Sequence, residues 1–131
     1  MNSIRAEAAS KIILLVDGDL EILEIMSELL NERGYLTVQA LNGQAALDLL
    51  KKMRDLPLLI VLDMSMPVLN GREFLRERGR DAIILAIPVI VVSGDPAPAT
   101  LPMGSDAYLR KPVTIDRLVA VIELLSGVQN G

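Results

Sequence analysis

The chain has 131 residues, of which 51% are apolar and 23% are charged, and this is the length and composition of one folded domain. Its 17 acidic residues outnumber its 13 basic residues, and the net charge of −4 argues against binding to nucleic acid or to an anionic membrane surface. The chain contains no cysteine and no histidine, which excludes disulfides, thiol nucleophiles, Cys/His zinc sites, Ser-His-Asp catalysis and phosphohistidine. A reactive site must therefore use carboxylates, hydroxyls, lysine or a hard cation bound by oxygen.

The first forty residues predict a leader, a strand, a helix and a second strand. Residues 1–10 contain two charged residues and no apolar core, so we expect a flexible leader rather than a signal peptide. The apolar run Lys11–Asp17 is typical of a strand that is covered on both faces. Residues Leu20–Arg33 have apolar side chains at helical spacing, with Asp19 in the position of an N-cap. Tyr35–Ala40 follows as a short strand.

The remaining segments continue the same alternation, which predicts a parallel sheet with right-handed crossovers. The longest uncharged apolar run, Ala82–Val92, has 11 residues and is too short to span a membrane, so we expect a cytoplasmic protein. Residues 127–131 are expected to form a flexible tail. The predicted elements are a helix at Gly43–Arg54, a buried strand at Leu58–Asp63, a charged helix at Gly71–Arg80, a buried strand at Pro88–Ser93, a short strand at Ala107–Arg110 and a helix at Thr114–Ser126.

The connection between the last two strands, Gly94–Gly104, does not follow the pattern. Pro96, Pro98 and Pro102 each remove a backbone donor, and each restricts the preceding residue to extended conformations. The longest stretch between these prolines, Ala99–Leu101, is shorter than one helical turn. We therefore expect the fourth helix to be short or missing.

Polar side chains stand where the predicted strands end. The carboxyl ends of parallel strands form the edge at which ligands bind, and Asp17, Asp63, Ser93 and Lys111 belong to that edge. A single aspartate at a strand end is commonly a cap or a turn former, and this role suits Asp19. Only the placement of several such residues at one edge therefore points to a ligand site. Clustered carboxylates repel one another unless a cation neutralises them, and lysine and hydroxyl groups suit phosphoryl oxygens. The edge therefore predicts metal-assisted phosphoryl chemistry on a carboxylate.

Three motifs at this edge carry a resemblance to a known family. They are LIVLDMSMPVLNG at Leu59–Gly71, VIVVSG at Val89–Gly94 and GSDAYLRKP at Gly104–Pro112. With them, residues 11–126 resemble the receiver domain of bacterial two-component response regulators. The resemblance implies a flavodoxin-like α/β fold with five parallel strands in the order 2-1-3-4-5 and helices on both faces of the sheet.

The resemblance also implies roles for individual residues. Asp63 would be the phosphoacceptor, and Ser65 would offer its backbone carbonyl to Mg²⁺. Ser93 would hydrogen-bond the phosphoryl group, and Lys111 would pair with its oxygens. Tyr108 would be the aromatic residue that moves inward as Ser93 shifts, so Ser93 and Tyr108 form the expected switch.

The expected metal site departs from the family pattern. Asp17 and Asp63 would bind Mg²⁺, but Gly18 stands where the family usually has a second acid. Asp19 is an alternative ligand, although its expected role as a helix cap points it away. We therefore expect weak Mg²⁺ binding. The resemblance also implies a cis peptide before Pro112.

Three functions remain open at this level. The first is a single-domain receiver that is phosphorylated by a histidine kinase or a phosphotransfer protein and then contacts a downstream protein. Its own chemistry would be limited to Mg²⁺-dependent self-phosphorylation from a phosphodonor and autodephosphorylation. We expect it to be a monomer that binds neither nucleic acid nor membrane and that signals through a face such as the first or last helix.

The second function is a receiver-like interaction module that is not phosphorylated, which Gly18 and the altered fourth connection would favour. The third is a small phosphatase of the haloacid-dehalogenase type, built on Asp17-Gly18-Asp19. Against it, Glu21 occupies the position of the expected hydroxyl residue, and no cap domain is present in the sequence.

Overall fold

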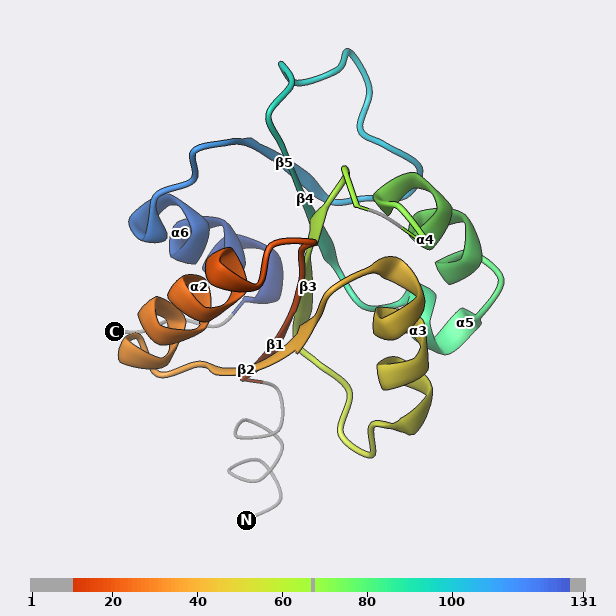
Figure 1. Ribbon diagram of the computed structural model, residues 1–131, viewed down its shortest axis with the longest axis horizontal. Coiled ribbons are helices and arrows are strands. Elements are labelled where there is room, and N and C mark those ends of the chain that lie inside the picture. The colour runs from red at the N-terminus through yellow and green to blue at the C-terminus, as the bar shows by residue number, and fades with distance from the viewer. Residues whose placement is uncertain (1–10, 67, 128–131) are drawn as a thin grey trace.

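A computed structural model describes residues 11–66 and 68–127, and these residues form a five-stranded sheet flanked by helices (Figure 1). All four strand pairings are parallel, and the strand order is β2-β1-β3-β4-β5, as predicted. The expected leader and residues 128–131 of the expected tail lie outside the described residues. The strands are β1 Ile12–Val16, β2 Leu36–Ala40, β3 Leu59–Asp63, β4 Val89–Ser93 and β5 Ala107–Arg110.

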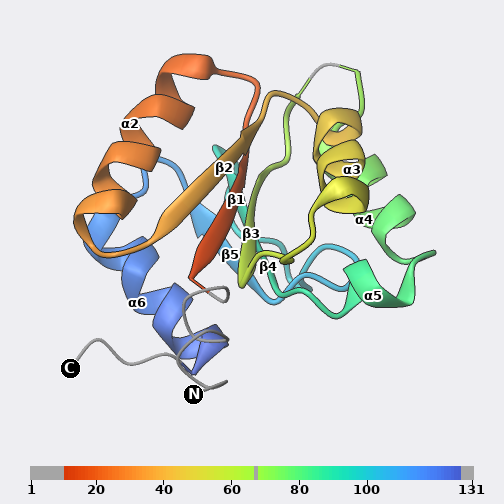
Figure 2. The same cartoon turned by 90° about the horizontal axis from the view of Figure 1, so that it is seen from below.

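Helices cover both faces of the sheet. Helices α2 and α6 lie on one face, and α3, α4 and α5 lie on the other, as Figures 1 and 2 show from two directions. None of the helices among the described residues has both the length and the apolar character that crossing a membrane requires. The helices are α2 Leu20–Glu32, α3 Gly43–Lys52, α4 Gly71–Arg78, α5 Ala82–Leu85 and α6 Ile115–Ser126.

The two faces of the sheet bury separate apolar clusters. In β1, Ile13 and Leu15 belong to the cluster under α2 and α6, whereas Leu14 and Val16 belong to the cluster under the other three helices. This alternation follows from the period of two along a strand. Every residue of β3 and β4 is buried, which explains why these strands are continuous apolar runs that end in polar residues.

Side-chain caps fix where the helices begin. The Asp19 carboxylate accepts hydrogen bonds from the backbone N–H groups of Glu21 at 3.0 Å and Ile22 at 3.4 Å, which confirms its expected capping role. At the start of α4, Asn70 and Glu73 form a capping box, with two hydrogen bonds of 2.9 and 3.0 Å between side chain and backbone. The β3–α4 connection, which contains the longest sequence motif, is thereby fixed at its far end.

Helix α5 was not predicted from the sequence. This single turn begins at Asp81, whose carboxylate accepts hydrogen bonds from the backbone N–H groups of Ile83 and Ile84. Its apolar residues continue without interruption into the buried strand β4, so periodicity alone gave no boundary. The capping residue Asp81 directly follows the predicted end of the preceding helix at Arg80, and no role was predicted for it.

The β4–β5 connection has no helix anywhere in residues 94–106, all of which are described, so the expectation of a short or missing fourth helix is confirmed. Arg78 anchors this connection from α4. Its guanidinium donates hydrogen bonds to the carbonyl of Gly104 at 3.1 Å, of Leu85 at 2.9 Å and of Ile87 at 2.7 Å. The side chain is only 2% exposed, and burial lowers its pKa, partly offset by the charge of Asp106.

Candidate functional site

Two aspartates stand side by side where the central strands end. Val16 of β1 pairs with Leu62 of β3, so the next residues along the two strands, Asp17 and Asp63, meet at the same edge. Asp63 is 5% exposed and Asp17 is 9% exposed. Two carboxylates so far removed from water require a positive partner, because burying an uncompensated charge is costly.

Lys111 supplies that partner from the segment after β5. Its Nζ lies 3.3 Å from Oδ1 of Asp63 and 3.6 Å from Oδ2 of Asp17. One ammonium beside two carboxylates leaves the cluster with a net charge of −1 when all three groups are ionised. The peptide bond between Lys111 and Pro112 is cis, as the family resemblance implied.

The protonation of Asp17 reflects its burial. Removal from water raises the pKa of Asp17, and the negative charge of Asp63 raises it further. The backbone N–H of Asp19, which donates to Oδ1 of Asp17 at 2.9 Å, and the ammonium of Lys111 act in the opposite direction without cancelling the rise. Lys111 therefore compensates the negative charge at this edge only in part.

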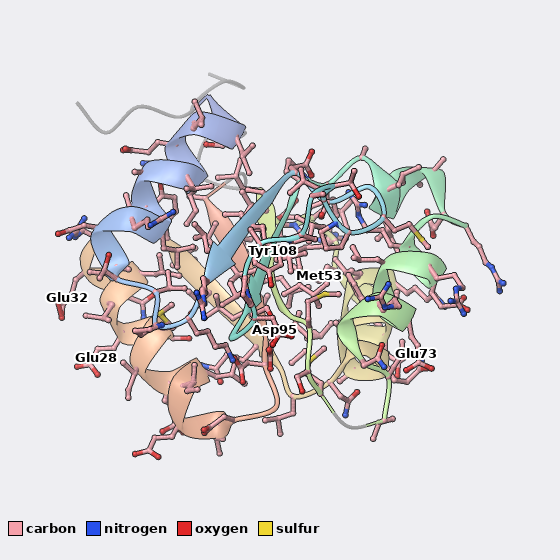
Figure 3. All side chains as sticks on the ribbon, turned by 90° about the horizontal axis from the view of Figure 1, so that it is seen from above. Glu28, Glu32, Met53, Glu73, Asp95 and Tyr108 are labelled. Carbon is pink, nitrogen blue, oxygen red and sulfur yellow. The ribbon has the colours of Figure 1, made fainter. Side chains whose placement is uncertain are left out.

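Ser93 and Tyr108 contact the same residue of the neighbouring loop. The Ser93 hydroxyl at the end of β4 accepts a hydrogen bond from the backbone N–H of Asp95 at 3.1 Å. The Tyr108 hydroxyl donates to the backbone carbonyl of Asp95 at 2.9 Å, and Figure 3 shows these two residues beside one another. The sequence did not point to Asp95, since both contacts use its backbone and leave no side-chain signature.

The donor set suits a hard cation. Asp17 and Asp63 offer carboxylate oxygens, and the backbone N–H of Ser65 donates to Oδ1 of Asp63 at 3.2 Å, which places the chain around Ser65 next to that carboxylate. Asp19 is separated in function, because its carboxylate caps α2. Within residues 11–66 and 68–127 no group of three or more acidic side chains could hold a metal ion. The residues thus fit a magnesium ion with two carboxylate ligands and several waters.

The loop after Asp63 is held by close backbone packing. A Cβ on Gly71 would lie 2.7 Å from the Cα of Met64, so only glycine fits at this position of the longest motif. Val68 has a φ of 70°, which is uncommon for a β-branched residue and is the kind of strain found beside functional sites. The sequence identified the Gly71 motif, but the conformation of Val68 has no signal in it.

The sequence of the chain is similar to that of known receiver domains. The family described as "Response regulator receiver domain" matches residues 13–123. The chain is 34% identical over 110 residues to sporulation initiation phosphotransferase F of Bacillus subtilis strain 168, which covers 81% of this chain and 86% of that protein. It is 35% identical over 117 residues to the transcriptional regulatory protein CpxR of Escherichia coli K12, covering 86% of this chain and 48% of CpxR, so it spans about half of that relative.

A solved structure shows the same fold with a metal. The receiver domain of the sensor histidine kinase PA1611 from Pseudomonas aeruginosa PAO1, which has a magnesium ion coordinated in its active-site cleft, matches with a TM-score of 0.80. The match covers 89% of this chain and 98% of that chain at 23% sequence identity. At this identity the likeness concerns the arrangement of strands and helices.

Proposed function

Because the chain belongs to the response regulator receiver domain family, we propose that it accepts a phosphoryl group on Asp63 from a histidine kinase or a phosphotransfer protein. The observation that carries the proposal is the Lys111 ammonium 3.3 Å from Oδ1 of Asp63 at the end of a fully buried strand. The Lys111 ammonium is therefore in a position to pair with the negative charge of a phosphoryl group that is transferred to Asp63.

In the proposed step, an Asp63 carboxylate oxygen forms a bond to phosphorus while the bond from phosphorus to the donor nitrogen breaks. The leaving imidazole keeps the electron pair of that bond. Lys111 and the backbone N–H of Ser65, which both lie at Asp63, stabilise negative charge on the phosphoryl oxygens. We assign the nucleophile to Asp63 rather than Asp17 because Asp63 ends the fully buried strand β3 and lies within the motif LIVLDMSMPVLNG.

A magnesium ion would be held by Asp17, Asp63 and the backbone carbonyl of Ser65. When bound, it neutralises charge on the transferring phosphoryl oxygens. Gly18 contributes no carboxylate, so water takes the place of the family's second acid and binding is weak. Asp17 also balances the ammonium of Lys111 when no metal is present.

Phosphorylation first changes the loop that Ser93 and Tyr108 both contact. A phosphoryl group on Asp63 attracts the Ser93 hydroxyl, which then gives up its bond to the Asp95 backbone. The Tyr108 hydroxyl bonds the same residue, so movement of Asp95 changes the position of Tyr108. The partner that reads this change is a protein, and the chain is a cytoplasmic monomer that binds neither nucleic acid nor membrane.

The experiment is an intact-mass measurement after incubation with acetyl phosphate, with and without Mg²⁺. The proposal predicts a mass increase of one phosphoryl group that requires Mg²⁺ and that disappears in Asp63→Asn. Asp48→Asn, an exposed aspartate of α3, is the matched control and should be labelled like the wild type. Labelling that persists in Asp63→Asn contradicts the proposal.

A receiver-like module that is not phosphorylated is the second candidate. Gly18 in place of an acid and the absence of a helix in residues 94–106 favour it. Under this alternative the protein stays unlabelled at every Mg²⁺ concentration, whereas the phosphorylated receiver is labelled once Mg²⁺ compensates for weak binding.

A further inference from the structure

An apolar cavity of about 450 Å³ opens beside the acidic edge. Its floor includes Val61 of β3 and Val92 of β4, and one wall is the side of α2 that carries Ile25 and Met26. The opposite wall is the segment after β5, which includes Val113. The cavity therefore lies on the α2/α6 face of the sheet, at the carboxyl ends of the strands.

The apolar part of the cavity is lined by aliphatic side chains, Met26 and Pro112, and, among the described residues, by no aromatic ring. Of the three aromatic residues in the chain, only Tyr35 belongs to the core cluster under α2 and α6. Phe74 and Tyr108 belong to the cluster on the other face. No aromatic side chain is among the described residues that line the space between α2 and the segment after β5.

The polar groups are confined to one end. Asp17, Asp63 and Lys111 all line the cavity, whereas its other lining residues are apolar. A mostly apolar cavity with a few convergent polar groups is the usual form of a small-molecule site, and roughly 300–1,000 Å³ is the usual size. The volume is about three times that of the engineered 150 Å³ cavity that accepts benzene.

The charge at the polar end selects one sign of ligand. When all three groups are ionised, two carboxylates and one ammonium sum to −1, and Gly18 adds no further charge at the edge. A monocation brings this sum to zero, whereas an anion doubles the imbalance in a partly dry site. A neutral molecule would gain the apolar contacts alone.

We propose that this cavity binds apolar organic monocations, with a body of one or two rings against Val61, Val92 and Ile25 and an ammonium head against Asp17 and Asp63. The head occupies the place that a magnesium ion would take, so the two exclude each other. Such a ligand also covers Asp63. The binding step itself needs neither metal nor phosphoryl donor, so it stands independently of the proposed phosphorylation.

The test uses 2-naphthylmethylammonium and follows backbone amide shifts in the magnesium-free protein. Three matched probes accompany it: 2-naphthylmethanol, which is neutral, 2-naphthoate, which is anionic, and methylammonium, which has no apolar body. We expect the naphthyl cation to bind about tenfold more tightly than the alcohol, as one partly buried ion pair allows. Naphthoate should bind most weakly of the naphthyl probes, methylammonium should not bind measurably, and added Mg²⁺ should displace the cation.

Two residues of α2 give a matched pair of variants. Ile25 is 51% exposed and lines the cavity, whereas Leu20 is 52% exposed and is not among the described residues that line it. Ile25→Ser should weaken binding of the naphthyl cation about fivefold through lost apolar contact, and Leu20→Ser should leave it unchanged. Asp17→Asn should weaken binding of the naphthyl cation without affecting binding of the alcohol. Thermal unfolding of each variant checks that it is folded.

Several outcomes overturn the proposal. They are the absence of binding, equal binding of naphthoate, amide shifts confined to residues away from the cavity, or equal effects of the two serine variants. Shifts of the cavity residues that depend on protein concentration alone would show that a second copy of the chain fills the space, which also contradicts it.

Discussion

Gly18 supplies no carboxylate to the edge that Asp17 and Asp63 form, and under the proposed metal site we expect this difference to lower the affinity for Mg²⁺. Gly18→Asp adds an oxygen ligand and a negative charge beside the two existing carboxylates. We expect Mg²⁺ to bind about tenfold more tightly to the variant, since ligand charge strongly affects the affinity for a hard cation. Calorimetric titration measures this, and an unchanged affinity would show that the position lies outside the metal site.

Burial of Asp17 makes the stability of the fold depend on pH. Its raised pKa means that the folded state binds this proton more tightly than the unfolded chain, whose value is near 3.8. The stabilisation is complete below that value and is lost as pH rises through the raised pKa. Asp17→Asn removes this pH-dependent loss of stability. The free energy of unfolding of the variant, relative to that of the wild type, should therefore increase from acid toward neutral pH.

Urea unfolding in magnesium-free buffer, from about pH 3.5 to about pH 7, measures this difference. The exposed Asp55→Asn is the control, and its difference from the wild type should not follow the same course. If the free energy of unfolding of Asp17→Asn, relative to that of the wild type, decreases toward neutral pH, the expected sign is wrong.

At the scale of elements, Arg78 links helix α4 to the segment before β4, through Leu85 and Ile87, and to the β4–β5 connection, through Gly104. Arg78→Met keeps the apolar stem but leaves the carbonyls of Leu85, Ile87 and Gly104 without their donor. We expect a loss of about 2–4 kcal/mol in the free energy of unfolding, because several acceptors lose a buried partner at once.

Chemical denaturation measures the loss, and Arg80→Met is the matched control. Arg80 is exposed and pairs only with Glu77 at 3.3 Å among the interactions described, so its replacement should cost less than about 0.5 kcal/mol. Equal effects of the two substitutions would show that Arg78 is not an anchor.

The elements that could be predicted from sequence are those with a local signal. The apolar runs of β3 and β4 and the prolines after Gly94 determine their structure within a few residues, so those predictions are confirmed. Helix α5 and the role of Arg78 could not be predicted in this way. The helix is a single turn within an apolar run, and Arg78 bonds only to backbone carbonyls, which every residue has.

The same distinction holds at the site. The sequence predicts that Asp17, Asp63 and Lys111 lie together because parallel strands end at one edge. In the structure, Nζ of Lys111 lies 3.6 Å from Asp17 and 3.3 Å from Asp63. The cavity beside them could not be predicted. It depends on how far α2 stands from the segment after β5, and that spacing is a property of the packed molecule.

At the scale of the whole molecule, the irregular connection bears on assembly. Residues 94–106 present no helix, so a dimer built on a helix after β4 has no surface to use. We expect sedimentation to give the mass of one chain both before and after treatment with acetyl phosphate and Mg²⁺. A dimer that forms on phosphorylation and packs through this segment would show that the connection supports assembly without a helix.

The central claim is that Asp63 carries the phosphoryl group, and identification of the modified residue tests it most directly. Borohydride reduces an aspartyl phosphate to homoserine, so the protein is treated with acetyl phosphate and Mg²⁺, reduced, digested and sequenced by mass spectrometry. We expect homoserine at position 63 and unmodified aspartate at positions 17 and 19. Homoserine at position 17, or at no position under saturating Mg²⁺, would contradict it.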